Sequence, residues 1–193
     1  MQLSQLVNIA SGLQVSTLPD ADYLPVPKPV QLLQLSDFSD DGVPLPPFRN
    51  QLTSLPPAAD KHLLRPGQVL LTAKGARLFA ACVQSDWLPA LASTSFFVLT
   101  VEDSRLLPEY LTLLLNMPAM RETFWALFTT TTIPTLSRRS LLTLELPELP
   151  PLALQHRAVE FHRLWLREKA LTISYLTHRE QLVFGTLTRF ITA

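Results

Sequence analysis

Three carboxylates lie close together in the first third of the sequence, at Asp37, Asp40 and Asp41. Clustered carboxylates with a lysine nearby are what a metal-dependent nuclease uses to bind its ions and activate water. These aspartates, however, lie in the segment SDFSDDG, whose serine, aspartate and glycine residues are typical of a solvated turn. The turn interpretation is therefore favoured over a metal site.

The histidines and the single cysteine predict neither a metal centre nor a nucleophile. His156 and His162 are six positions apart in a helical segment, so their side chains face away from each other. Cys82 lies in the apolar run FAACV and is more typical of a buried small side chain than of an activated thiolate. No Gly-x-Ser-x-Gly sequence marks a nucleophilic serine. We expect no metal and no cofactor.

The tetrapeptide LPPF at residues 45–48 is similar to the Asn/Asp-Pro-Pro-Tyr/Phe signature of DNA methyltransferases that act on amino groups. That chemistry needs an Asn or Asp to hydrogen-bond the amine, and Leu45 occupies this position here. The chain also has only five glycines, too few to supply a glycine-rich cofactor loop. The sequence therefore favours a non-catalytic binding protein over a stand-alone hydrolase or transferase.

Proline and charge divide the chain at the same place. All 17 prolines lie at or before Pro151, so only the sequence beyond it is free to form one long helix. Ten basic and thirteen acidic residues precede that boundary, whereas six basic and three acidic residues follow it. We expect a first domain at residues 1–150 and a long helix at 151–193, with no signal peptide or membrane span. The lone cysteine favours the cytoplasm.

The hydrophobic pattern of the first domain predicts a small β-rich unit. Strands are expected within four segments that run between turn-forming residues: 30–38, 65–73, 76–84 and 93–101. Two short helices are expected over 108–128, broken at Pro118, and then a turn capped by Ser137 and a last strand near 142–146. The rest of residues 1–60 is expected to be irregular. The predicted fold class is α+β: a mixed or antiparallel β-rich domain with short helices, then one long coiled-coil-type helix.

The predicted long helix carries a heptad repeat of mostly apolar side chains. Alternate steps of three and four from Leu152 to Phe190 define this heptad seam. The expected dimer contacts are five of its apolar members: Val159, Leu166, Ile173, Leu176 and Val183. A second stripe widens the apolar face: Phe161, Trp165, Tyr175 and Leu182. A helix of about 35 residues would extend about 50 Å, so pairing with another molecule is favoured over packing back on its own domain.

Six short motifs follow one another along the chain. In order they are residues 9–12 (IASG), 64–71 (LRPGQVLL) with Gly75, 108–111 (PEYL), 129–132 (TTTT), 133–137 (IPTLS) and 150–155 (PPLALQ). No single motif is specific. Their order and spacing, which cover nearly the whole chain, resemble the specificity subunit of type I restriction-modification systems.

The resemblance implies a half-size subunit with no catalysis of its own. Members of the family usually contain two target-recognition domains, each followed by a long helix, and the two helices pair antiparallel. This chain resembles one half, with residues 1–150 as the target-recognition domain, so a second copy would supply the other half as a homodimer. The implied partners are double-stranded DNA, an adenine DNA methyltransferase subunit and, in a full complex, a restriction and translocation subunit.

Side chains suited to DNA contact lie in two segments of this domain. Lys74 and Arg77 flank Gly75 in a predicted turn, from which long side chains can reach a groove. The second segment offers hydroxyls and paired guanidinium groups for phosphates: Thr130, Thr131, Ser137, Arg138 and Arg139. The alternative is that the threonines form a strand and the two arginines solvate a turn.

The acidic balance of the first domain is poorly suited to a DNA-reading domain, because binding to the phosphate backbone needs cations. Two interpretations stay open. Either DNA binding is shared with partner subunits and needs the assembled complex, or the chain is an orphan or decoy module. Such a module would bind methyltransferase or specificity subunits without reading DNA itself.

Overall fold

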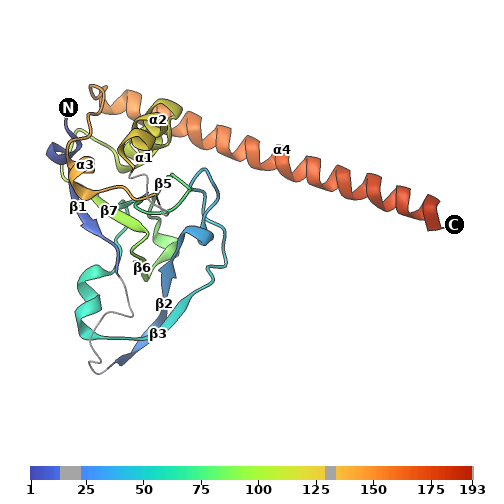
Figure 1. Cartoon of the computed structure of the whole chain (residues 1–193), viewed down its shortest axis with the longest axis horizontal. Coiled ribbons are helices and arrows are strands. Elements are labelled where there is room, and N and C mark those ends of the chain that lie inside the picture. The colour runs from blue at the N-terminus through green and yellow to red at the C-terminus, as the bar shows by residue number, and fades with distance from the viewer. Residues whose placement is uncertain (14–22, 129–133, 193) are drawn as a thin grey trace. The chain divides into compact units, whose positions relative to one another are not determined.

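The computed structural model describes residues 1–13, 23–128 and 134–192. The chain divides into two compact units, Met1–Gln155 and His156–Ala193. The described strands and short helices belong to the first unit, and the second consists of most of one long helix (Figure 1). The predicted α+β fold class is confirmed.

Two β-sheets form the framework of the first unit (Figure 1). One has the strand order β1-β7-β4-β5 and is antiparallel throughout. The other has the order β3-β2-β6, in which β2 runs antiparallel to β3 and parallel to β6. The strands are β1 (Val7–Ser11), β2 (Leu24–Leu33), β3 (Gln51–Leu55), β4 (Val69–Thr72), β5 (Ala80–Cys82), β6 (Ala90–Ala92) and β7 (Phe96–Val101).

Short helices connect and cover these sheets. They are the 3-10 helices η1 (Leu3–Gln5), η3 (Leu35–Asp37), η4 (Pro57–His62) and η5 (Ser85–Trp87), and the α-helices α1 (Pro108–Asn116), α2 (Pro118–Leu127) and α3 (Arg138–Leu142). Pro108 and Pro118 each occupy the first turn of a helix, where a backbone N–H would have no helical partner. The predicted break at Pro118 is therefore confirmed.

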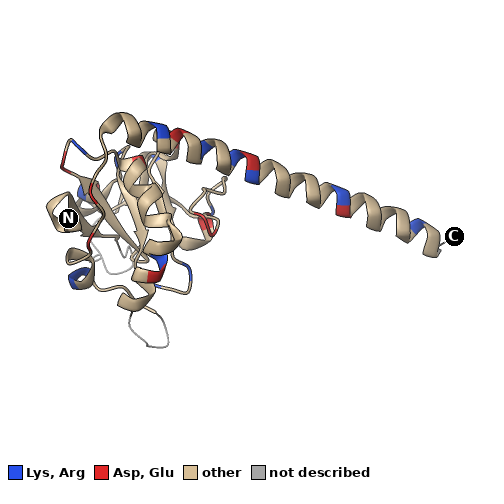
Figure 2. Ribbon diagram, turned by 90° about the horizontal axis from the view of Figure 1, so that it is seen from above, with Lys and Arg blue, Asp and Glu red and all other residues tan. Residues whose placement is uncertain are grey.

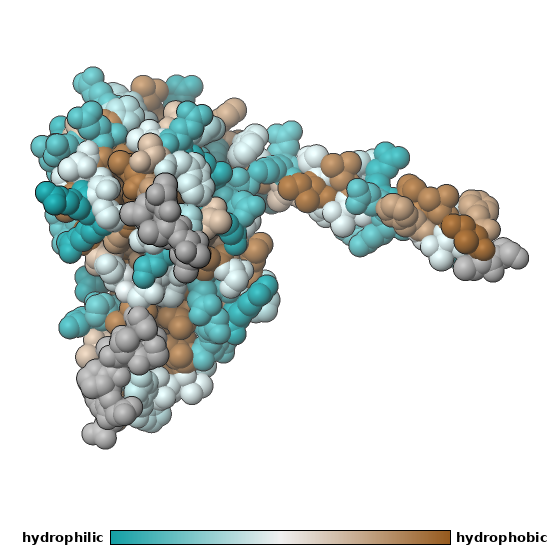
Figure 3. Space-filling view, in the orientation of Figure 1, coloured by the Kyte–Doolittle hydropathy of each residue, from teal (hydrophilic) through white to brown (hydrophobic). Residues whose placement is uncertain are grey.

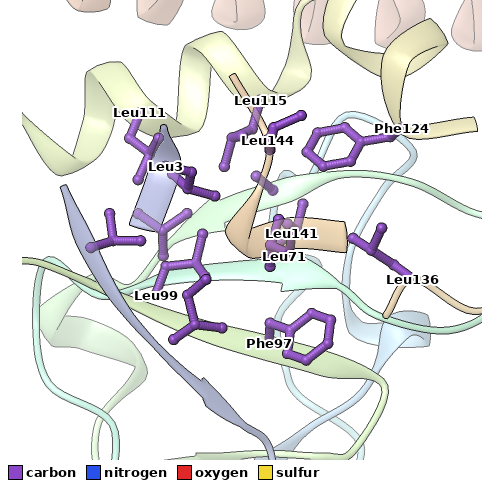
Figure 4. Packing of buried hydrophobic residues seen from close by; sticks show 14 of the residues in the cluster. Leu3, Leu71, Phe97, Leu99, Leu111, Leu115, Phe124, Leu136, Leu141 and Leu144 are labelled. Carbon is purple, nitrogen blue, oxygen red and sulfur yellow. The ribbon is translucent and has the colours of Figure 1, made fainter. Parts of the chain in front are cut away.

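The central strands β4 and β7 are buried on both faces of the first sheet, which explains their continuous apolar sequences. On one face, Leu71 and Leu99 pack in a cluster with Leu111 and Leu115 of α1 and Phe124 of α2. Figure 4 shows these side chains between the strands and α1. Because alternate residues of a strand point to opposite faces, the neighbouring strand residues face a second core.

Aromatic rings fill that second core. Phe38 lies among them, with its ring centroid 5.5 Å from Phe79, 5.6 Å from Trp87 and 5.8 Å from Phe96. Phe48 adds a ring whose centroid is 6.4 Å from that of Phe38. The last residue of the LPPF tetrapeptide is thus a packing residue of this core.

Gly12 explains why the motif at residues 9–12 ends in glycine. Ile9 is buried in the core, and the N–H of Gly12 donates to the carbonyl of Phe96 at 2.9 Å. A Cβ atom at position 12 would lie 1.9 Å from the carbonyl oxygen of Ser93, closer than side-chain atoms can approach. The close passage of these two backbones therefore requires glycine.

Several elements differ from the sequence prediction. The strands β1 and β3 lie in residues 1–60, which were expected to be mostly irregular, and β6 has no predicted counterpart. The predicted strand near 142–146 is wrong, because the N-cap at Ser137 starts a helix that continues to Leu142. Glu145 then forms only an isolated bridge with Gln2. The long helix α4 (Leu152–Thr192) has 41 residues rather than about 35.

Gln155, in the first turn of α4, is fully buried and bonds three backbone groups of the first unit. Its Oε1 accepts from the N–H of Leu107 at 2.9 Å, and its Nε2 donates to the carbonyls of Arg105 at 2.6 Å and Pro150 at 2.9 Å. Leu107 is the N-cap residue of α1. One side chain therefore joins the start of α4, the start of α1 and the proline pair that precedes α4.

An ion pair orders the loop that contains Arg105. Its guanidinium lies 2.7 Å from the carboxylate of Asp103, and its backbone N–H donates to the same carboxylate at 2.8 Å. These hydrogen bonds from Arg105 lower the pKa of Asp103 to about 2. Since the pKa is lowered on folding, the contact is fully present above the ordinary carboxyl pKa and is lost as the pH falls through about 2.

Replacement of Gln155→Ala should destabilise the first unit, because it leaves the N–H of Leu107 and two carbonyls without their partner. We expect a loss of about 3 kcal/mol in the free energy of unfolding and a fall in Tm of roughly 6 to 12 °C, measured by calorimetry. Gln181→Ala on the exposed part of α4 is the matched control and should leave Tm nearly unchanged. Equal Tm values for the two variants would contradict this role of Gln155.

Candidate nucleic-acid interface and assembly helix

The two segments predicted to contact DNA are joined in the structure by backbone pairing. The N–H of Gly75 donates to the carbonyl of Pro134 at 2.9 Å, and Lys74 forms an antiparallel bridge with Thr135. Since Ser137 follows two residues later, the turn that carries Lys74 lies beside the start of α3. Residues about sixty positions apart in sequence therefore form one surface.

Three cations on this surface have exposed side chains: Lys74, Arg138 and Arg139. Within the described part of the chain, none of the three forms an ion pair. We call these three residues the basic surface. Unpaired, exposed lysine and arginine side chains are the groups that proteins use to contact phosphates.

Ser137 has a structural role at this place. Its hydroxyl accepts the backbone N–H of Ser140 at 3.0 Å and so caps the N-terminus of α3. The side chain is exposed, and its predicted contact with phosphate stays a prediction. Thr130 and Thr131 lie outside the described residues.

Arg77 is engaged with its own domain. Its guanidinium donates to the carbonyl of Leu35 at 3.0 Å and to that of Phe38, and its Nε lies 2.7 Å from the carboxylate of Asp40. The same group lies over the ring of Phe79, 5.5 Å from the centroid. Arg77 therefore holds η3 and the following turn against the β4–β5 connection, and its predicted DNA contact is not tested by these distances.

Arg121 of α2 is a second anchor of this turn, which the sequence did not reveal. Its guanidinium donates to the carbonyl of Asp40 at 2.9 Å. The two residues are 81 positions apart, and no local pattern links them. The turn at residues 39–42 is therefore held by guanidinium groups from two distant segments.

The three aspartates of this region do not converge on one point. Asp37 is buried, and its carboxylate accepts the backbone N–H groups of Gln34 at 2.8 Å and Arg49 at 3.3 Å. Asp40 pairs with Arg77 instead. Among the described residues, no group of three His, Cys, Asp or Glu side chains could hold a metal ion. The contacts of Asp37 and Asp40 are those of a turn, but Asp37 is buried in it, whereas the sequence predicted a solvated turn.

Cys82 at the end of β5 lies in an environment that suppresses its ionisation. Burial, with a smaller contribution from the carboxylate of Glu109, raises the pKa of its thiol to about 12. A thiolate is the nucleophilic form of cysteine, so this residue is a poor nucleophile at neutral pH. The packing interpretation of the FAACV run agrees with this environment.

The heptad seam of α4 carries apolar side chains that are largely exposed. Ile173, Leu176 and Val183 are 55%, 54% and 52% exposed, whereas Val159 and Leu166 are half-buried. Figure 3 shows apolar side chains along this helix. More than half of each of these three side chains is accessible to a partner.

A second set of apolar side chains lies on the other side of α4. At about 100° per residue, Leu164, Leu171, Tyr175 and Leu182 recur on one line roughly opposite to the seam. Their exposed fractions run from 57% to 71%. We call these four residues the opposite face. Tyr175 and Leu182 belong to the stripe predicted from the sequence and lie on this face, whereas Trp165 of the same stripe lies at the edge of the seam.

None of the helices in the described ranges is both long and apolar enough to cross a membrane.

The fold of this chain can be compared with the folds of known protein structures. The chain has the fold of specificity (S) subunits of type I restriction-modification systems, and the fold expected from the motif order is therefore confirmed. No protein-family model matches the chain, and no curated protein sequence matches it.

Three solved structures illustrate the likeness. The S subunit from M. genitalium gives a TM-score of 0.57 at 16% identity over 86% of this chain and 38% of its own. The HsdS subunit from Thermoanaerobacter tengcongensis gives 0.56 at 18% identity over 88% and 37%. A chain from a type I system, solved to explain complex assembly and conformational transition, gives 0.59 at 20% identity over 89% and 39%. This chain thus spans less than two fifths of each.

Cys82 should react slowly with alkylating reagents. At pH 8 a thiol with a pKa of about 12 is on the order of 1,000-fold less ionised than an ordinary cysteine. Mass spectrometry after iodoacetamide treatment should show strong protection in the folded protein and rapid labelling in urea. Equal labelling rates in the two states would show that Cys82 is an accessible, reactive thiol.

Proposed function

We propose that this protein is a half-size, non-catalytic specificity subunit of a type I DNA methyltransferase complex. The observation that carries the proposal is the extent of the structural match. The match covers most of this chain but only 37–39% of each of three S-subunit structures. A share of that size is what one recognition domain and one long helix would occupy in a subunit that contains two of each. The motif order from residues 9–12 to residues 150–155 supports the same assignment.

DNA contact is assigned to the basic surface. Lys74, Arg138 and Arg139 offer exposed cations on adjacent backbone segments, a suitable arrangement for neighbouring phosphates of one duplex. Thr130 and Thr131 remain in the proposed interface because their motif continues into Ser137. Arg77 would act there as a positioning residue, because its guanidinium already bonds residues 35–40.

Assembly is assigned to α4. A second copy of the chain would cover the heptad seam and restore two recognition domains, one for each half of a bipartite DNA site. The opposite face is assigned to a helical segment of the adenine methyltransferase, because a paired helix still exposes it. A restriction and translocation subunit would join only a larger complex.

An interaction module that does not read DNA is the second candidate. The excess of acidic residues before Pro151 favours it, because a domain of that charge attracts phosphate weakly. The two functions separate in a salt titration of the complex with its methyltransferase. DNA reading gives an affinity that falls steeply with salt and differs between sequences, whereas the module leaves the methyltransferase's own DNA binding unchanged.

Removal of the basic surface should weaken DNA binding without changing sequence preference. For Lys74→Ala with Arg138→Ala and Arg139→Ala, we expect at least a tenfold loss of affinity for a pool of random-sequence duplexes and a salt slope lower by about one per lost contact. Lys28→Ala is the control for the loss of an exposed cation elsewhere. An unchanged salt slope in the triple variant would remove these residues from the interface.

Charged residues on the heptad seam should give soluble monomers. Leu166→Glu with Ile173→Glu would force carboxylates into the apolar layers between two helices, so light scattering should report half the mass of the unaltered protein. The control is Leu171→Glu with Leu182→Glu on the opposite face, which should leave the dimer intact and impair methyltransferase binding. A dimer that survives the seam substitutions would place the interface elsewhere.

A further inference from the structure

Two opposite charges interrupt the apolar seam of α4 after His162. Lys169 and Glu180 occupy seam positions, and Ile173 and Leu176 lie between them. In the ribbon of Figure 2, the charged residues of α4 form separate groups with an uncharged stretch between them, which corresponds to residues 170–178. The centre of the seam is therefore apolar, with a cation on one side of it and an anion on the other.

These two charges cannot satisfy each other within one helix. Eleven residues separate them, which corresponds to about 16 Å along the axis. Glu180 forms no ion pair with any described residue, although Glu160 on the same helix lies 3.3 Å from Arg163. The ammonium group of Lys169 lies over the ring of Trp165, 5.3 Å from the centroid, at the edge of the seam. The carboxylate of Glu180 is exposed and therefore accessible to a cation of another molecule.

We propose that two copies of α4 pair antiparallel about a twofold axis between Ser174 and Tyr175, with Lys169 opposite Glu180 of the partner subunit. This proposal rests on the homodimer of the proposed function and specifies its register. In an antiparallel pair, the two position numbers of every facing pair of seam residues have the same sum, so this one contact determines all the other seam pairs. The facing pairs are 159 with 190, 162 with 187, 166 with 183, 169 with 180 and 173 with 176, and each occurs twice.

A parallel pair is disfavoured by the same charges. Parallel, in-register helices place each seam residue against its own copy, so Lys169 would face a lysine and Glu180 a glutamate. Antiparallel pairing converts both repulsions into attractions. It also avoids like charges at the flanking positions, where Arg163 faces Phe184 and Arg179 faces Thr172 of the partner subunit.

Registers shifted by one heptad are disfavoured as well. A shift in one direction places Lys169 against Leu187 and Glu180 against Leu176, so both charges would face apolar residues. A shift in the other direction places Lys169 against Ile173 and Leu187 against Gln155, although Gln155 is fully buried in the first unit. Of these three registers, only the proposed one pairs both charges.

The charged pair would select the register at some cost in affinity. A polar residue at one seam position commonly specifies alignment and oligomeric state while weakening the coiled coil. A partly buried ion pair contributes little net stability, but a like-charge contact in the same place is strongly unfavourable. The effect of Lys169 and Glu180 is therefore expected in specificity rather than in tightness.

Disulfide cross-linking between differently substituted chains tests the register directly. Mixed Leu166→Cys and Val183→Cys chains should cross-link to each other, because these positions face each other in the proposed pair. Leu166→Cys alone should not cross-link to its own copy, since the two sites would be about 25 Å apart along the axis. The native Cys82 is replaced by serine in all of these chains, so that disulfides form only between the introduced cysteines.

Charge reversal supplies a second, independent measurement by analytical ultracentrifugation. Lys169→Glu and Glu180→Lys should each weaken the homodimer at least about 100-fold, because each variant creates two like-charge contacts. The double variant Lys169→Glu with Glu180→Lys should restore the original affinity. In a parallel dimer, neither single variant would introduce a new kind of repulsion, and no rescue would be seen.

The outcomes separate the register from the dimer itself. Efficient cross-linking of Leu166→Cys to its own copy, or a stable dimer that lacks the 166–183 cross-link, would overturn the proposed register and leave the homodimer standing. A chain that stays monomeric at all concentrations would overturn the homodimer and the register together. Cross-linking with double-variant rescue supports both.

Discussion

A single buried amide joins the three segments that meet where α4 begins. Gln155 accepts from the N–H of Leu107 and donates to the carbonyls of Arg105 and Pro150, so all its strong hydrogen-bonding groups are used. A buried amide of this kind is stable only when its partners are fully in place. The proline pair, the start of α1 and the first turn of α4 therefore depend on one another, and the seam begins at a defined residue.

The elements that the sequence predicts well are those whose structure is determined locally. Each of these elements depends on residues that are close together in sequence. They are the apolar runs of β4 and β7, the break at Pro118 and the heptad repeat of α4. The strands β1, β3 and β6 have only three to five residues each, and they form because distant strands pair with them: Val7 pairs with Val101. Their existence depends on tertiary contacts, which a periodic pattern does not contain.

In the candidate site, too, the sequence predicts local features but not contacts between distant segments. Exposed cations beside a predicted turn identify Lys74, Arg138 and Arg139, but the sequence does not reveal that the two segments pair through the backbone. Arg77 bonds the carbonyl of Leu35 in its own domain, 42 positions away, a contact that its place near a predicted turn does not reveal. Long-range hydrogen bonds of this kind decide whether a cation is free for a ligand.

The exposed apolar residues on both sides of α4 also bear on how the protein is maintained in a cell. Side chains such as Ile173 and Leu182 are the type of surface that chaperones and proteases recognise in incompletely assembled proteins. If α4 pairs as proposed, copies without a partner would keep this surface exposed and be removed, while assembled copies would persist.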